Sequence, residues 1–323
     1  MTRKPLVIAL EEHYLDAEVK AKFAPVDAAA GRPPHVAERL ADLGALRLKE
    51  MDEAGVDIQV LSHGAPSLQK MDAESAVALA RGANDRLAAA CRANPSRLAA
   101  FAALPTPDPK AAADELERTV TKLGFKGTMI HGLTNGVFHD DKRFWPIYER
   151  AEALDVPIYI HPAYPHPAVV EAYYKDYLRD YPVIASAGWG FTVETATQGL
   201  RMVLSGVFDK YPKLQIILGH LGEGLPFYLW RITHTLQRRE NRADAKTFRD
   251  IFCAHFYVTT SGFFSDPALQ CCITELGIDR VMFSIDYPFV PNPPGTEWIE
   301  ALSLNAVDKE KILSGNAKRL LRI

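Results

Sequence analysis

The stretch that decides the fold lies near the N-terminus and reads Leu6-Val7-Ile8-Ala9-Leu10-Glu11-Glu12-His13. Its first five residues are continuously apolar, which is typical of a parallel strand buried on both faces. Glu11 and His13 are two residues apart, so on a strand they face the same side and can bind one metal ion together. We expect Glu12 to face the other way, toward the helices.

The same pattern of an apolar run that ends in polar residues recurs along the chain. Expected strands cover residues 6–10, 58–61, 98–103, 127–130, 158–160, 214–218, 256–259 and 281–284. Helical patterns cover residues 45–54, 74–94, 109–123, 144–154, 192–209, 225–238, 267–276 and 309–321. This alternation predicts a (β/α)₈ barrel, with a doubly wound open sheet as the alternative. The positions of the polar residues favour the barrel.

Two long segments interrupt the alternation, residues 20–40 after the first strand and 162–191 after the fifth. Both would lie over the C-terminal mouth of a barrel, where long loops are usually functional. The sequence contains no repeat, low-complexity tract or linker, so we expect a single domain over residues 1–323.

Composition excludes several classes of function. The net charge is −3, from 37 basic and 40 acidic residues, which predicts no nucleic-acid or membrane-surface partner. No apolar stretch approaches the roughly 20 residues of a membrane span. The four cysteines lack a CxxC spacing, which favours reduced thiols and a cytoplasmic protein. No dinucleotide or P-loop glycine motif occurs.

Residues with metal-binding and catalytic side chains follow four of the expected strands, and strand ends converge at the mouth of a barrel. They are Glu11 and His13, then His161, then His220 and Glu223, and finally Asp286. A set of two carboxylates and imidazoles suits Zn²⁺ or Mn²⁺ better than Ca²⁺ or Cu. Each residue alone also fits a structural part, such as a hydrogen-bonded His or a turn-forming Asp. Their joint occurrence favours a site, and the parts played by His63, His131 and His166 stay open.

The motifs resemble those of the amidohydrolase superfamily, and in particular its branch of non-oxidative decarboxylases, which includes aminocarboxymuconate semialdehyde decarboxylase. The γ-resorcylate (2,6-dihydroxybenzoate) and 5-carboxyvanillate enzymes of that branch are the most similar. The matching segments are residues 9–13, 158–162, 217–226 (Ile-Leu-Gly-His-Leu-Gly-Glu-Gly-Leu-Pro) and 283–289 (Phe-Ser-Ile-Asp-Tyr-Pro-Phe).

The resemblance implies roles for individual residues. It implies one divalent ion, Zn²⁺ or Mn²⁺, on Glu11, His13, His161 and Asp286, because His131 stands where the hydrolases of the superfamily carry a carboxylated lysine. It implies that His220 and Glu223 form a catalytic pair and that Arg231 binds the substrate. His63 and the loop 163–167 depart from the family pattern.

The function expected from this resemblance is the reversible decarboxylation of an ortho-hydroxybenzoate, as a step in aromatic compound catabolism. Asp286 would coordinate the metal and protonate the ring carbon, while His220 assists the proton transfer. An apolar wall of Trp189, Phe191 and Phe289 would exclude water, although ordinary core packing also explains these aromatics. The alternatives are a metal-dependent hydrolase of a lactone or amide, a hydratase of a ring-cleavage product, and a binding protein without activity. Family likeness also implies a dimer or tetramer.

Overall fold

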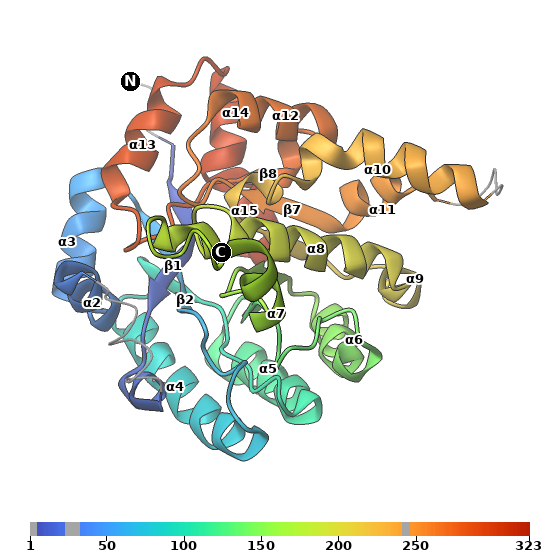
Figure 1. Ribbon diagram of the computed structural model, residues 1–323. Helices are drawn as coiled ribbons and strands as arrows, with labels where there is room; N and C mark the ends of the chain where they lie inside the picture. Colours follow the sequence, from blue (N-terminus) through green and yellow to red (C-terminus); the bar gives the residue numbers. More distant parts are fainter. Residues whose placement is uncertain (1–4, 23–32, 241–245) are drawn as a thin grey trace.

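The computed structural model describes residues 5–22, 33–240 and 246–323, without the side chains of 237–240. The described residues form eight strands surrounded by helices (Figure 1). The strands are β1 (Ile8–Tyr14), β2 (Ile58–His63), β3 (Leu98–Ala100), β4 (Thr128–His131), β5 (Ile158–His161), β6 (Ile216–Leu218), β7 (Phe256–Thr259) and β8 (Val281–Met282). The longer helices are α2 (Pro34–Ala41), α3 (Ala45–Ala54), α4 (Ala73–Ala93), α5 (Pro109–Leu123), α6 (Trp145–Leu154), α8 (Gly190–Leu204), α10 (Leu225–Glu240), α11 (Phe248–His255), α12 (Asp266–Leu276) and α13 (Asn292–Ala301).

The strand order identifies a (β/α)₈ barrel and excludes the doubly wound sheet. All ladders are parallel, and neighbouring strands are consecutive in sequence, β1-β2-β3 and β4-β5-β6-β7-β8. A doubly wound sheet would contain a point where the order reverses. A parallel bridge between Ala102 and Thr128 joins the two sheets on one side. On the other side the His13 N–H donates to the Tyr287 carbonyl at 2.6 Å, next to β8.

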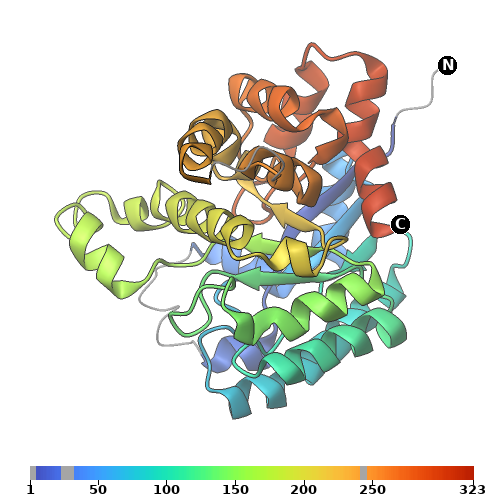
Figure 2. The same ribbon diagram turned by 90° about the vertical axis from the view of Figure 1, so that its right-hand side faces the viewer.

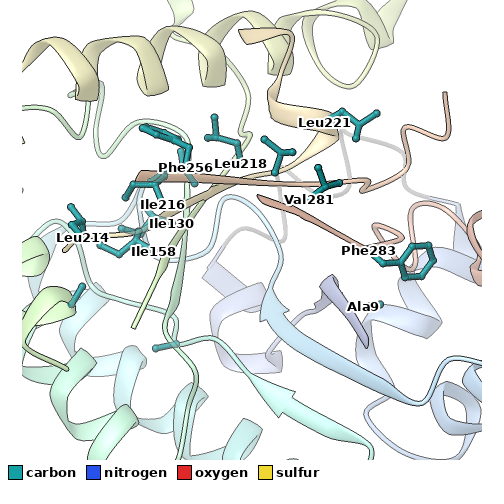
Figure 3. Close-up of a cluster of buried hydrophobic side chains, with 14 of the residues drawn as sticks. Ala9, Ile130, Ile158, Leu214, Ile216, Leu218, Leu221, Phe256, Val281 and Phe283 are labelled. Carbon is teal, nitrogen blue, oxygen red and sulfur yellow. The ribbon is translucent and has the colours of Figure 1, made fainter. Parts of the chain in front are cut away.

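The side chains of successive residues in each strand point alternately into two apolar layers. The barrel interior is filled by side chains such as Ile8, Leu10, Met129, Ile217 and Met282. The other face of each strand packs against the helices in a larger cluster (Figure 3). Because both faces are buried, the strands read as continuously apolar runs in the sequence.

Several boundaries differ from the sequence-based expectation. The helical pattern expected over 192–209 forms two helices. α8 ends at Leu204, and Gly206, with a φ of 80°, separates it from α9 (Val207–Lys210). The pattern over 309–321 is divided among α14 (Ala306–Glu310), a π-helical turn (Lys311–Gly315) and α15 (Asn316–Leu321). The expected insertion over residues 20–40 contains part of α2, and its residues 23–32 lie outside the described residues. Helices α2, α11 and α13, of eight to ten residues, were not predicted.

The segment after β5 leaves the barrel at its C-terminal end. It contains α7 (Pro167–Val169) and two short helical turns, Val170–Tyr174 and Pro182–Ala185, before α8 begins. Figure 2 shows this yellow-green segment reaching out beside the strand ends. Within the described part of the chain, no helix has the length and apolar character that crossing a membrane requires.

Candidate metal centre

A bulge in β1 sets the direction of the first two candidate ligands. Ala9 pairs with Gln59 and Glu12 with Leu61, so β1 contains one residue more than β2 over this interval. A bulge reverses the alternation of side chains after it. Leu10 faces the barrel interior. After the bulge, Glu11 and His13 face this interior too, and Glu12 faces the opposite side.

Four residues from three separate parts of the barrel meet at this point. Glu11, His13, His161 and Asp286 each offer one ligand atom, and these atoms all lie within 4.8 Å of one another. Glu11 Oε1 lies 3.0 Å from His161 Nε2, and His13 Nε2 lies 3.3 Å from Asp286 Oδ1. The first three residues are buried and Asp286 is only partly exposed.

The hydrogen bonds of this cluster fit a divalent ion. Glu11 Oε1, His13 Nε2 and Asp286 Oδ1 are buried, and none has a hydrogen-bond partner among the described residues. Both imidazoles use Nδ1 elsewhere: His13 contacts Ser62 Oγ at 3.1 Å, and His161 contacts the Pro162 carbonyl at 2.6 Å. Partners of this kind fix the tautomer of a metal-binding histidine and leave Nε2 for the ion. The cluster therefore suits one divalent metal ion.

The second oxygen of Glu11 lies in a cradle of hydroxyl groups. Tyr159 OH donates to Oε2, and Ser261 Oγ donates to it at 2.6 Å. Thr259 Oγ1 lies 2.6 Å from both of these hydroxyl oxygens. A Cβ atom at Gly219 would lie 2.5 Å from Oε2, so only glycine fits beside the carboxylate. The cradle leaves Oε1 as the free ligand atom.

Sequence reasoning missed this cradle. Tyr159 precedes His161 by two residues on β5, and Ser261 follows β7. The spacing of two was the available signal for Tyr159, since it places both side chains on one face.

His220 and Glu223 lie beside the cluster and contact each other. His220 Nδ1 is 2.7 Å from Glu223 Oε1, while its Nε2 is 3.6 Å from Glu11 Oε1 and 4.0 Å from Asp286 Oδ2. His220, Glu223 and Asp286 have positive φ angles of 47°, 55° and 73°. Left-handed conformations are unfavourable for residues other than glycine and concentrate at functional sites.

The charges of the cluster shift its pKa values strongly. Burial opposes ionisation of Glu11, yet the positive charges of His220 and His161 hold its pKa well below the usual value. Burial also lowers the pKa of His13, but the close carboxylates of Asp286 and Glu11 outweigh it and raise the pKa to about 9. Burial opposes protonation of His220, and the nearby Glu223 and Glu11 raise its pKa well above the usual value. An imidazole must lose its proton to bind metal, so metal binding should release protons.

Glu12 points away from the ligand cluster, as expected from the sequence, and lies on the face of β1 that it shares with its partner Leu61. Its carboxylate accepts hydrogen bonds from backbone N–H groups of Ile285 and Tyr287, on either side of Asp286. Burial raises the pKa of Glu12 to about 8, and these two donors oppose that effect. Both oxygens accept from backbone N–H groups, and hydrogen bonds of this kind favour the ionised form of a carboxyl group.

The other predicted residues lie at different distances from the cluster. The Phe289 ring is 5.6 Å from that of His13, centroid to centroid. Trp189 is 55% exposed just before α8, and Phe191 is half-buried in its first turn. Arg231 lies on the exposed side of α10.

The three histidines whose parts stayed open have different surroundings. His131 is buried beside His161, with their Nδ1 atoms 2.9 Å apart. His63 Nε2 accepts a hydrogen bond from the backbone N–H of Asp16. His166 is exposed and caps α7 through Nδ1.

The chain is similar over nearly its whole length to proteins of one known class. Residues 13–323 match the family model described as Amidohydrolase. γ-Resorcylate decarboxylase from a Polaromonas species is 39% identical over 330 residues, 98% of each chain. A Polaromonas dihydroxybenzoic acid decarboxylase, solved with manganese and the inhibitor 2-nitroresorcinol, has a TM-score of 0.90 at 38% identity, covering 99% of this chain and 97% of that one. 5-Carboxyvanillate decarboxylase from Sphingomonas paucimobilis has a TM-score of 0.91 at 37% identity, covering 99% and 100%.

The fold and the buried ligand cluster are those of a metal-dependent barrel enzyme, and the chain belongs to the amidohydrolase family. Its likeness to decarboxylases extends over essentially the whole of both chains. Within that family the protein is accordingly a carboxy-lyase.

Proposed function

We propose that this protein is a non-oxidative decarboxylase of ortho-hydroxybenzoates, with 2,6-dihydroxybenzoate as the first substrate to test. The observation that carries the proposal is the convergence of Glu11, His13, His161 and Asp286, with unpartnered ligand atoms at the barrel mouth. The full-length likeness to γ-resorcylate decarboxylase supports the choice of substrate.

We assign the four clustered residues as ligands of one divalent ion. Mn²⁺ is the first candidate, because a similar structure was solved with manganese, and Zn²⁺ is the second, since the donors suit it equally. When bound, the ion would supply Lewis acidity and hold the oxygen atoms of the substrate in place.

The residues around this ion are arranged to move a proton. Decarboxylation requires a proton on the ring carbon that bears the carboxylate, after which the C–C bond breaks, CO₂ leaves and its bonding electrons restore the aromatic ring. Asp286, at the edge of the cluster, is the proposed donor. His220 lies 4.0 Å from Asp286 Oδ2 and is held through Nδ1 by Glu223. It is therefore placed to return a proton to Asp286 after each turnover.

Aromatic residues would enclose the ring of the substrate. Phe289 is the best supported of them, because it packs against His13. Trp189 and Phe191 begin the helix that follows the long segment after β5, and we propose that they complete the wall when the substrate is bound. Removing water there would strengthen the electrostatic interactions of the site.

The test begins with chelator-treated protein reloaded with Mn²⁺ or Zn²⁺. We expect CO₂ release from 2,6-dihydroxybenzoate, and in D₂O one deuterium on the ring carbon that carried the carboxylate. Resorcinol with concentrated bicarbonate should give back the acid. A panel of other ortho-hydroxybenzoates defines the ring substituents. Absence of CO₂ release from the whole panel with either metal would contradict the proposal.

A metal-dependent hydrolase is the second candidate, because the same cluster could activate water. A hydratase of a ring-cleavage product is the third. The reloaded protein separates them: hydrolysis of lactones or amides, or hydration, without CO₂ exchange on any hydroxybenzoate favours one of these.

We further propose a homo-oligomer, a dimer or tetramer. The exposed side of α10 carries Phe227, Tyr228 and Trp230, which are 75%, 53% and 67% exposed. Contiguous exposed aromatics of this size mark an interaction surface. Arg231 lies on this surface, so its proposed contact with substrate would be made in the assembled form. Light scattering of wild-type and Trp230→Glu protein tests the assembly, and KM of Arg231→Ala tests the contact.

Residues 1–323 are proposed to form one domain, which a single cooperative unfolding transition would support.

We also propose a cytoplasmic location, because the four cysteines are free thiols. Cell fractionation tests it.

A further inference from the structure

The barrel closes between β8 and β1 in an unusual way. Among the described residues, no ladder joins these two strands. Two bonds from the backbone of β1 cross the seam: the His13 N–H donates to the Tyr287 carbonyl at 2.6 Å, and the Glu11 N–H donates to Ser284 Oγ at 2.7 Å. Side-chain hydrogen bonds therefore replace part of the ladder that joins neighbouring strands within each of the two sheets.

Glu12 makes the largest share of these side-chain contacts. It is fully buried. Oε1 accepts from the Ile285 N–H at 3.0 Å and from Ser284 Oγ at 3.3 Å. Oε2 accepts from the Tyr287 N–H at 3.1 Å. One carboxylate thus binds the backbone N–H groups on both sides of Asp286.

The residue between those two N–H groups is one that needs such support. Asp286 has a φ of 73°, a conformation that L side chains rarely adopt unless their surroundings enforce it. Its Oδ1 lies 3.3 Å from His13 Nε2, within the ligand cluster. Because the aspartate side chain is short, the backbone conformation at Asp286 largely sets the position of this oxygen.

A buried cation supports the same seam from behind. Arg47 of α3 is fully buried, and its Nη2 donates to the His13 carbonyl at 2.6 Å. Its guanidinium also lies over the Tyr287 ring, 4.8 Å from the centroid. Arg47 therefore holds residues on both sides of the seam, and its charge is opposite to that of Glu12.

We infer that Glu12 is a positioning residue, which closes the β8–β1 seam and holds Asp286 in the orientation that the metal site uses. The inference rests on the metal site proposed above, but not on the identity of the substrate. A carboxylate suits the task because it offers two acceptor oxygens to two N–H donors. Glutamine offers one acceptor oxygen, and its NH₂ group would face an N–H donor.

The test compares Glu12→Gln with Glu194→Gln. Glu194 is also a buried carboxylate, but it accepts from only one backbone N–H, that of His166, and stands apart from the seam. The first measurement is hydrogen exchange of the metal-free proteins. In Glu12→Gln the amides of Ile285 and Tyr287 should exchange faster, while in Glu194→Gln they should match the wild type.

The second measurement is the Kd for Mn²⁺, with the electron paramagnetic resonance spectrum of the bound ion, well below the melting temperature of each variant. Loss of an outer partner of a metal ligand typically weakens binding about 10- to 100-fold, so Glu12→Gln should fall in this range with an altered spectrum. Glu194→Gln should bind like the wild type. A purely structural Glu12 would lower only the melting temperature.

The outcomes are distinct. Wild-type exchange at both amides, or a wild-type Kd and spectrum, in folded Glu12→Gln overturns the inference. If that variant does not fold, Glu12→Asp takes its place: it keeps both acceptor oxygens but, being one methylene shorter, withdraws them from the Ile285 and Tyr287 N–H groups. Wild-type Mn²⁺ binding by folded Glu12→Asp overturns the inference as well. Wild-type protein that binds no Mn²⁺ or Zn²⁺ refutes the metal site itself, and with it this inference.

Discussion

Replacing Tyr159 by Phe removes a single hydroxyl group from the environment of Glu11. In the wild type, that hydroxyl donates to Oε2, the oxygen that points away from the ligand cluster. The ring itself is buried in the barrel interior and keeps its packing. The substitution therefore isolates the orientation of one metal ligand.

The magnitude follows from the hydrogen bonds of the cradle. A hydrogen bond to a charged group contributes about 1.5–3 kcal/mol, and about 1.4 kcal/mol corresponds to a tenfold change in an equilibrium constant. Ser261 Oγ still donates to the same oxygen at 2.6 Å, so Glu11 keeps one of its two donors. Thr259 keeps its contact with Ser261. We expect metal affinity to fall about 10- to 100-fold. The free energy of unfolding of the metal-free protein should fall by about 1.5 kcal/mol, the low end of the range for a charged acceptor, because Ser261 still binds the same oxygen.

The assay is competition for Mn²⁺ against a chelating indicator, with chemical unfolding of the metal-free protein alongside it. Tyr148→Phe is the matched control, since Tyr148 is equally buried but donates to the His139 backbone carbonyl at 2.5 Å. The control should lose a similar amount of stability and no metal affinity. Equal metal affinities of Tyr159→Phe and wild type would refute the idea that the cradle aims Glu11.

Four further predictions concern the same site. Asp286→Asn should retain metal and substrate binding yet turn over at least roughly a hundredfold more slowly, because loss of a general acid typically costs about 10²–10⁴-fold; metal analysis and single-turnover rates check this. His220→Asn should also be slow with an unchanged metal content, whereas an emptied site together with an active Asp286→Asn would reverse the two roles. Gly219→Ala should displace the Glu11 carboxylate, because its Cβ would lie 2.5 Å from Oε2; a Kd for Mn²⁺ equal to that of the wild type would contradict this. Chelation should abolish CO₂ release and added Mn²⁺ should restore it, while activity that survives complete metal removal argues against any metal role.

The sequence by itself determined the architecture and the kinds of ligand. Apolar runs, helical periodicity and residues at strand ends are local patterns, and all eight expected strands overlap observed ones, β1 to β8. Because the ends of parallel strands meet at one mouth, the sequence also predicted that Glu11, His161 and Asp286 would come together, and the structure brings them within 4.8 Å.

Only the tertiary structure decided how these residues are aimed. The bulge between Ala9 and Glu12 is a matter of register against β2, and it turns Glu11 rather than Glu12 into the pocket. The hydroxyl cradle of Tyr159 and Ser261 and the contacts of Glu12 across the seam join residues 148 to 275 positions apart. No local periodicity records such contacts, since they depend on which strand ends face each other once the barrel has closed.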